Sequence, residues 1–407
     1  MADRDRILVV GGGHAEIPLI DAAHELGFEV FTTGNRPHDL GHRRADGYVG
    51  RDFSDPEAIR DLAAELGVVG IVSGCNDFAA ISTASAAEQF GLPGHDSHET
   101  YLRIHHKDRF RALLEELGLP TPRSVVVRDA AHVVEQCEPL GYPVIVKPVD
   151  LTGGKGMTVC RSPHELAPAI DHAFTLTRQD YVVVEQFMEG TRHGYTCFVA
   201  GHRVGFWFAD DEQYYRNEFL VSGTTTPTSM PAPALDELRA SVERISEHLG
   251  LVDGLMHVQC ILTANGPRIV ELCRRCPGDL YPWFVQLSTG YPYARAVVQS
   301  ELGLPFDTAP ADGRPVARHC LMATSEGVLR SIEMDDTVTA RLIEQMTWWQ
   351  AGDRITNHLV DKFGIVFLGF DGVDDMTSLA PTLSDRIAIT ITADDAVSAP
   401  TAPAVTP

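Results

Sequence analysis

The strongest constraint on the fold is the alternation of short apolar segments with amphipathic segments through the first hundred residues. The expected strands are Ile7–Val10, Glu29–Thr32 and Val68–Ser73, and the expected helices are 14–26, Pro56–Leu66 and Phe78–Phe90. Strands that alternate with helices of this length predict βαβ units and an open parallel sheet. We therefore expect an α/β fold that begins with a Rossmann-like domain.

Three glycines, Gly11–Gly13, follow the first expected strand. A tight turn of this kind can hold a pyrophosphate at a helix N-terminus. The full dinucleotide fingerprint needs a further glycine at position 16, which is Glu16 here, and a carboxylate beside a pyrophosphate costs a few kcal/mol in a partly screened site. We expect a tight turn that lines a small-molecule pocket, with an NAD enzyme as the alternative.

The charge balance excludes some partners. The chain has 33 Lys and Arg against 56 Asp and Glu, a formal charge of −23, which repels phosphate backbones and anionic lipids. We therefore expect no nucleic acid and no membrane among its partners, and a few local Lys and Arg residues must gather any small anion. The charged start of the chain and the scattered eight cysteines predict a reduced, cytoplasmic protein.

Beyond about His106 one apolar strand ends in a lysine. Val144-Ile145-Val146-Lys147 is followed by the loop Gly153-Gly154-Lys155-Gly156. A lysine at the end of a buried strand is costly unless it meets an opposite charge, and the N–H groups of a glycine-rich loop can close over phosphate oxygens. A phosphate site and a hairpin with a surface-reaching lysine both fit this segment.

A second candidate segment, Glu185-Gln186-Phe187-Met188, ends another apolar strand. Its backbone can hydrogen-bond to an adenine edge while Phe187 and Met188 supply apolar contact. A strand end that contributes only core residues is the alternative.

A third candidate is a hairpin that carries polar oxygens. Gln259 and Glu271 lie twelve residues apart on expected strands at 256–262 and 268–272. If the strands pair in register, both side chains project oxygens to one site, as a hard divalent cation requires. Arg275 adds a cation for a carboxylate or a phosphoryl group, although a structural Glu–Arg ion pair is also consistent with the spacing.

The sequence Cys273-Arg274-Arg275-Cys276 has the spacing of a redox pair or of half a zinc site. The sequence holds no second C-x-x-C, so zinc would need a distant ligand such as His257. We expect neither use.

The order and spacing of these motifs resemble the ATP-grasp superfamily, in the branch similar to biotin carboxylase and the large chain of carbamoyl-phosphate synthetase. The resemblance spans about residues 6–390. It implies a Rossmann-like domain over 1–105, an α+β ATP-grasp domain in two parts over 106–308 with a lid at about 124–190, and a small β-rich region over 309–392. It also implies a homodimer, ATP, and Mg²⁺ with Mn²⁺ as the alternative ion. The tail 393–407, rich in Ala, Pro and Thr, is expected to be disordered.

The resemblance also assigns roles to residues. Lys107 and Lys147 match the phosphate-binding lysines, and Gly153, Gly154, Lys155 and Gly156 match the lid loop. The nucleoside contacts are expected from Glu185, Gln186, Phe187, Met188, Ile261 and the ribose-contacting His193. Gln259 and Glu271 match the magnesium positions, and Glu271 and Arg275 are the expected catalytic residues.

One position departs from the family pattern. The family reads Glu-x-Asn-x-Arg where this chain has Glu271-Leu272-Cys273-Arg274-Arg275. Cysteine is a soft and poor ligand for magnesium, so Cys273 is a doubtful metal ligand. An ATP-binding regulatory protein without turnover is therefore one alternative.

The resemblance predicts an ADP-forming ligase that joins a small-molecule carboxylate to an amine, of the amino-acid or peptide type, through an acyl phosphate. Arg275 is expected to orient the acyl phosphate or the substrate carboxylate. The other expected substrate contacts are Tyr214, Arg216, Ser222, Gly223 and His257, although a plain surface loop also fits the segment 211–231. A carboxylate–thiol ligase that loads a carrier protein is the second enzymatic candidate.

Overall fold

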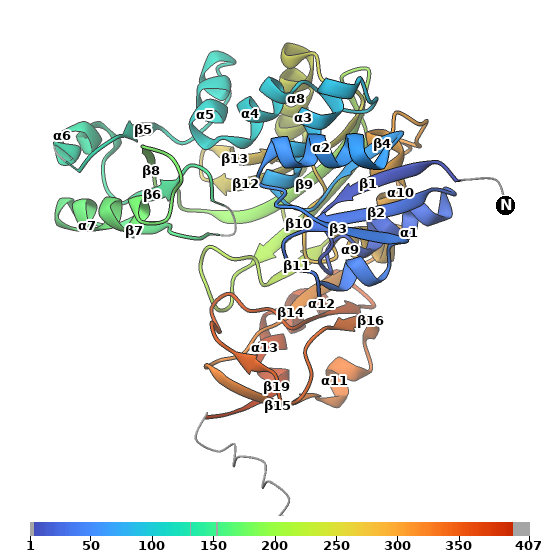
Figure 1. Cartoon of the computed structure of the whole chain (residues 1–407). Coiled ribbons are helices and arrows are strands. Elements are labelled where there is room, and N and C mark those ends of the chain that lie inside the picture. The colour runs from blue at the N-terminus through green and yellow to red at the C-terminus, as the bar shows by residue number, and fades with distance from the viewer. Residues whose placement is uncertain (1–3, 131, 152–153, 394–407) are drawn as a thin grey trace, which may run out of the picture.

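The computed structural model describes residues 4–130, 132–151 and 154–393 of the chain (Figure 1). The described residues form four sheets, of four, eight, three and four strands, with helices packed against them. The predicted α/β class is confirmed. The predicted disorder of the tail falls, from residue 394 on, outside the described residues.

The N-terminal sheet is parallel, as expected, with the strand order β3-β2-β1-β4. Its elements are β1 (Arg6–Val10), α1 (Ile17–Glu25), β2 (Glu29–Gly34), β3 (Gly47–Gly50), α2 (Pro56–Leu66), β4 (Gly70–Ser73) and α3 (Asp77–Phe90). Helix α2 has local signals at both ends. Asp55 accepts a hydrogen bond from Glu57 N, and Gly67 ends the helix with a φ of 61°.

The turn after β1 is held by Glu16. Its carboxylate accepts hydrogen bonds from Gly13 N and from Cys75 N, both at 2.8 Å. These N–H groups are the ones that would face an anion at this turn. The prediction of a tight turn is consistent with this geometry, because the side chain of Glu16 itself occupies the position of the pyrophosphate.

Two helices, α4 (His98–His105) and α5 (Lys107–Glu116), lead to a smaller antiparallel sheet with the order β5-β8-β6-β7. This unit contains β5 (Ser124–Val127), α6 (Val133–Cys137), β6 (Val144–Pro148), β7 (Thr158–Cys160), α7 (Pro163–Phe174) and β8 (Val182–Gln186). It has a core of its own, built from residues such as Val146, Leu166 and Val184. Figure 1 shows it projecting sideways from the rest of the molecule, and we refer to residues 124–186 as the lid unit.

The central sheet has eight strands in the order β13-β12-β9-β10-β11-β14-β18-β16. These strands are β9 (Thr191–Ala200), β10 (Arg203–Gln213), β11 (Gly223–Thr226), β12 (Gly254–Thr263), β13 (Gly266–Cys273), β14 (Val316–Leu321), β16 (Leu342–Thr347) and β18 (Gly364–Gly369). Helices α8 (Ala232–Leu249), α9 (Tyr281–Thr289) and α10 (Tyr293–Glu301) pack against it. The expected hairpin of β12 and β13 is present, and its turn lies between Thr263 and Gly266.

The C-terminal part adds strands to two sheets. Strands β14, β16 and β18 extend the central sheet, whereas β15 (Gly327–Met334), β17 (Arg354–Ile355) and β19 (Ile387–Thr392) form a separate sheet of three. Short helices α11 (Asp336–Thr339), α12 (Val373–Leu379) and α13 (Leu383–Arg386) accompany them. Among the described residues, no helix has both the length and the apolar character needed to cross a membrane.

The largest core joins parts that are distant in sequence. Buried side chains of β1 and α1 pack in one cluster with β9, α9 and β18, including Ile7, Leu19, Phe198, Phe284 and Ile365. The N-terminal sheet is therefore fixed against the central sheet by apolar contact, which orients its loops toward the site described next.

Candidate functional site

A cavity of about 350 Å³ lies between the lid unit and the central sheet, within the size range of small-molecule sites. Its charged lining residues in the described part of the chain are the cations Lys107, Arg111, Lys147, Arg192, Arg275, Arg318 and Lys362 and the acids Glu185, Glu212, Glu271 and Asp279. Seven cations face four carboxylates in a chain whose formal charge is −23. The cavity is thus a local site for anions, as the sequence required.

The lysine that ends β6 meets a buried carboxylate. Lys147 Nζ lies 2.6 Å from Glu185 Oε2, and Arg111 Nε lies 2.8 Å from Glu185 Oε1. Burial alone would raise the pKa of Glu185, but the charges of Arg111 and Lys147 outweigh it and lower the pKa to about 2. Two cations share one carboxylate here, so an excess positive charge remains beside the cavity.

Glu185 was expected among the nucleoside contacts. Its side chain is fully buried and both of its oxygens are used by Arg111 and Lys147, so its contact to a base would have to come from the backbone. The neighbouring residues keep a position suited to a base, because Gln186, Phe187, Met188 and Ile261 all line the cavity. The N–H groups of Gln186 and Phe187 donate to Arg123 O and Pro143 O, so the next N–H, that of Met188, is the candidate donor to a ligand.

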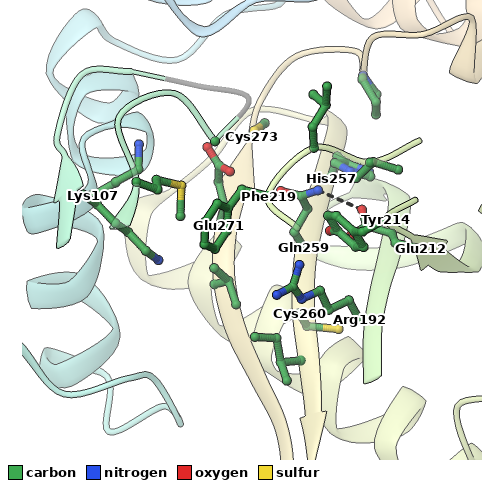
Figure 2. Close-up of a pocket in the computed structure, with 18 of the residues that line it drawn as sticks. Lys107, Arg192, Glu212, Tyr214, Phe219, His257, Gln259, Cys260, Glu271 and Cys273 are labelled. Atoms are coloured by element: carbon green, nitrogen blue, oxygen red, sulfur yellow. Dashed lines mark hydrogen bonds between the residues drawn. The ribbon is translucent and has the colours of Figure 1, made fainter. Parts of the chain in front are cut away.

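The expected pair of metal ligands is in register. Gln259 pairs directly with Glu271 across β12 and β13, and both side chains line the cavity (Figure 2). The carboxylate of Glu271 has no hydrogen bond or ion pair within the described residues. Gln259 Nε2 donates to Glu212 Oε1 at 2.7 Å, an assignment that leaves the amide oxygen of Gln259 free.

Glu212 is a carboxylate that the sequence analysis missed. It lies on β10 beside Gln259, and its second oxygen accepts a 2.5 Å hydrogen bond from Tyr214 Oη. Figure 2 shows Glu212, Gln259 and Tyr214 clustered on the same side of the cavity, with Arg192 nearby. The guanidinium of Arg192 lies 4.4 Å from the ring centre of Tyr214. Oxygen donors from Gln259 and Glu271, supported by Glu212, match the hard ligands that magnesium prefers.

Arg275 is anchored by the N-terminal domain. Its Nε donates to Asp77 Oδ1 at 2.8 Å, and the same oxygen accepts from His105 Nδ1 at 3.1 Å and from Cys273 Sγ at 3.7 Å. Burial would raise the pKa of Asp77, but the adjacent Arg275 and His105 hold it well below its ordinary value. The arginine lines the cavity as expected, and its orientation depends on Asp77.

Cys273 is not suited to bind magnesium. Burial raises the pKa of its thiol well above the ordinary value, and its sulfur lies against Asp77. The trio Asp77, His105 and Cys273 is close enough to hold a metal ion, but Arg275 already compensates the carboxylate. Cys273 and Cys276 are free thiols, so the described structure holds no disulfide at this motif.

The lid loop touches the far wall of the cavity. Gly154 has a φ of 73°, and a Cβ there would come within 2.4 Å of Phe219 Cβ. On the lid side, Lys107 Nζ donates to Leu151 O at 2.7 Å. Lys155 and Gly156 were expected in the same loop but are not among the residues that line the cavity. Gly153 lies outside the described residues.

Three expected substrate contacts lie elsewhere. Arg216 and Ser222 border a small separate depression near the three-stranded sheet, and Gly223 packs against the ring of Tyr215. Alternate residues of a strand point to opposite faces, so Glu212, Tyr214 and Thr224 face the cavity while Gln213, Tyr215 and Gly223 face away.

His193, the expected ribose contact, is not among the residues that line the cavity either. It is fully buried, and its ring nitrogens bond to Thr191 and Asp211.

His257 does line the cavity, as expected for a substrate contact. Burial, together with the charges of Arg275 and Arg318, lowers its pKa to about 3, so the imidazole is neutral near pH 7. Its Nδ1 is buried without a hydrogen-bond partner among the described residues. A neutral ring with an unused nitrogen beside two arginines is suited to accept or donate one hydrogen bond to a ligand.

The sequence analysis missed several lining residues, including Arg111, Glu212, Phe219, Arg318 and Lys362. Glu212 lies in the segment 211–231, which the sequence analysis considered for substrate contacts, but it was not singled out there. The other missed residues reach the cavity only because their segments pack against parts of the chain that are distant in sequence.

Comparisons with known proteins agree with this geometry. Residues 106–200 match the family described as carbamoyl-phosphate synthase L chain, ATP binding domain. The chain is 25% identical over 325 residues to the carbamoyl phosphate synthase large chain of Deinococcus radiodurans, covering 74% of this chain and 31% of that protein. It thus spans about a third of the length of the carbamoyl phosphate synthase large chains that it matches.

Two further proteins are similar over most of their own length. The formate-dependent phosphoribosylglycinamide formyltransferase of Corynebacterium efficiens is 27% identical over 314 residues, with 74% of this chain and 76% of that protein covered. The crystal structure of an L-amino acid ligase from Bacillus licheniformis superposes with a TM-score of 0.81 at 19% identity, covering 96% of this chain and 100% of that one. At that identity the superposition shows a shared fold.

Proposed function

We propose that the chain is an ATP-dependent ligase of the ATP-grasp superfamily that joins a small-molecule carboxylate to an amine, with release of ADP and phosphate. Its similarity to the ATP binding domain of carbamoyl-phosphate synthase and its shared fold with an L-amino acid ligase support the proposal. The observation that carries the proposal is the registered pair Gln259 and Glu271, which faces the same cavity as Lys147 and Arg275. This arrangement supports the proposal, because it offers oxygen atoms for a cation, a lysine for phosphate and an arginine for a carboxylate around one space.

The residues present fit a nucleotide with its metal ion. The adenine would lie against Phe187, Met188 and Ile261, with Met188 N–H as donor, and the phosphates would lie by Lys107 and Lys147. The free carboxylate of Glu271 and the free amide oxygen of Gln259 would hold magnesium. When bound, the ion neutralises charge on the phosphates and on the phosphoryl group in transfer.

The chain's own residues perform the remaining tasks. Arg275, fixed by Asp77, holds the substrate carboxylate so that one of its oxygens can attack the terminal phosphorus and displace ADP. Gly154 against Phe219 closes the lid side and excludes water, which would otherwise hydrolyse the acyl phosphate. The amine then attacks the acyl carbon, the phosphate leaves with the carboxylate oxygen, and the nitrogen loses its proton to give the amide.

The test is ADP release by the whole chain with Mg-ATP against a matrix of amino acids and simple amines, for the wild type and for Glu271→Gln. We expect one pair of compounds to give rapid ADP release that Glu271→Gln reduces at least about 100-fold, as loss of an electrostatic contact in a transition state does. ATP that binds without turnover for any pair would contradict the ligase proposal. That result would favour a regulatory protein or a thiol acceptor.

A further inference from the structure

Arg318 is a buried cation without a carboxylate partner. It lies on β14, its exposed fraction is 4%, and it lines the cavity. Its hydrogen bonds go only to neutral oxygens, namely Thr224 Oγ1 at 3.1 Å, Gly278 O at 3.3 Å and Asp279 O at 3.0 Å. Its second terminal nitrogen, Nη2, makes no hydrogen bond within the described residues. A buried charge left in this state is costly.

The other fully buried arginines are compensated. Arg111 pairs with Glu185, and Arg274 pairs with Asp96, each at 2.8 Å. Arg275, which is slightly exposed, pairs with Asp77. Among the buried arginines at the cavity in the described structure, Arg318 is the exception that has no ion pair. Arg192 also lines the cavity without an ion pair, but it is partly exposed.

Two acids near Arg318 have other partners. Asp279 gives its carboxylate to Lys362 Nζ at 2.5 Å, and Asp210 accepts a hydrogen bond from Tyr281 Oη at 2.6 Å. Neither forms an ion pair with Arg318 within the described residues. Lys362, which is partly exposed, also lines the cavity, and its ion pair takes up the carboxylate of Asp279.

The position of Arg318 separates it from the nucleotide. Its guanidinium is held by the backbone of Gly278 and Asp279, a few residues beyond Arg275, whereas the proposed phosphate contacts, Lys107 and Lys147, belong to α5 and the lid unit. Asp279 and Leu280 have φ values of 56° and 55°, and this rare left-handed backbone ends the segment whose carbonyls hold Arg318. Arg318 thus reaches the cavity from β14 and from the segment that follows Arg275, rather than from the lid unit.

We propose that Arg318 binds a carboxylate that the reaction does not consume, carried by the amine substrate. The second substrate is then an α-amino acid or a short peptide rather than a simple amine. This inference rests on the proposed ligase function and names its acceptor class. The acyl group is activated at Arg275, and a carboxylate held at Arg318 places the amino group of the same molecule toward it.

The test measures binding directly. The whole chain with Mg²⁺ and the non-hydrolysable analogue AMP-PNP is titrated by calorimetry with each proteinogenic L-amino acid and with the matching α-amide. We expect at least one amino acid to bind about 10-fold or more tightly than its amide, because a hydrogen bond to a charged group is lost in the amide. In Arg318→Met the acid and the amide should bind equally, and Arg318→Lys should retain part of the preference.

The inference is overturned if no amino acid binds to the wild type, if acid and amide bind equally, or if Arg318→Met keeps the preference. Should Arg318→Met fail to fold, Arg318→Lys decides, because an undiminished preference for the acid in that variant would assign the carboxylate to Arg275 instead. A failure of the ligase proposal would look different. An amino acid would then bind in a way that depends on Arg318, but no ADP would be released from Mg-ATP.

Discussion

Glu185 holds two buried cations on one carboxylate, and its contribution to stability can be measured. Removing its charge in Glu185→Gln leaves Lys147 and Arg111 buried without compensation. We expect the free energy of unfolding to fall by about 3–5 kcal/mol, as for other broken buried pairs. Urea unfolding measures this, and Glu189→Gln, an exposed glutamate in the same segment, should change stability by less than about 0.5 kcal/mol.

The same pair makes a prediction about pH. The pKa of Glu185 is about 2 in the folded chain against an ordinary value of 4.5, so the unfolded chain binds the proton first as the pH falls. The stability that Glu185 supplies is therefore full above about pH 4.5 and is lost as the pH falls toward 2. Glu185→Gln should lack this part of the acid dependence. An unchanged slope in the variant would show that the carboxylate is not paired as described.

Glu212 and Gln259 give a prediction about the metal ion. The amide of Gln259 is oriented by donation to Glu212, so Glu212→Ala should let it rotate and raise the Mg²⁺ concentration needed for half-maximal activity several-fold. Glu212→Gln keeps an acceptor oxygen and should stay within about twofold of the wild type, because a neutral hydrogen bond is worth only about 1 kcal/mol. Magnesium titrations of ADP release make the comparison. Equal effects of both variants would mean that the charge of Glu212 acts directly.

At the scale of residues, sequence patterns predicted several side chains on or just after strands that line the cavity. Lys147, Gln259, Glu271 and Arg275 all reach the cavity, because alternation along a hairpin fixes the face on which each side chain lies. Glu185 and Arg318 could not be assigned this way. The partner of Glu185 comes from α5, and the neighbours of Arg318 come from β11 and the segment before α9.

At the scale of elements, the lid loop packs closely against the segment before β11, where Gly154 faces Phe219. Gly154→Ala would place a Cβ at 2.4 Å from Phe219 Cβ and would strain a left-handed backbone. We expect turnover to fall by about 10-fold or more, since water would enter the cavity. The measurement is kcat for ADP release together with the ratio of ADP released to amide formed.

The matched control is Gly118→Ala. Gly118 has a φ of 60°, and no atom lies within 4 Å of the position that a Cβ would take there, so the substitution costs backbone strain of about 1 kcal/mol without a clash. Its turnover should equal that of the wild type. If both variants lose turnover alike, strain rather than lid closure explains the loss.

The boundaries of most elements followed from local signals. Pro56–Leu66 was predicted with the bounds that the structure has, and Phe78–Phe90 differs from α3 by one residue, because capping residues mark both helices. The segment 211–222 did not follow from such signals. Its conformation depends on pairing of β10 with β11 and on contact with the lid, so Arg216 and Ser222 were assigned to the wrong face.

At the scale of the molecule, the N-terminal domain contributes to the site through Asp77. This residue begins α3 and fixes Arg275, which follows β13. We expect Asp77→Asn to lower kcat about 10-fold or more through misplacement of Arg275, with the affinity for ATP unchanged by calorimetry. Asp61→Asn, an exposed residue of α2, is the matched control and should alter neither quantity.

A loss of ATP affinity equal to the loss of kcat in Asp77→Asn would point instead to general disruption of the cavity. The long-range nature of this contact explains why it was not predicted. Asp77 and Arg275 are brought together only by the core that joins β1, α1, α9 and β18, and no local pattern in the sequence encodes that packing.

The most direct test of the central claim follows oxygen atoms. The carboxylate substrate found by ADP release is supplied with both carboxylate oxygens replaced by oxygen-18, the amine substrate is supplied unlabelled, and the released phosphate is analysed by mass spectrometry. If the carboxylate attacks the terminal phosphorus at Arg275, each phosphate carries one labelled oxygen and the amide product keeps the other. Unlabelled phosphate, with labelled oxygen retained in full by the product or by unreacted acid, would contradict activation of a carboxylate in this cavity.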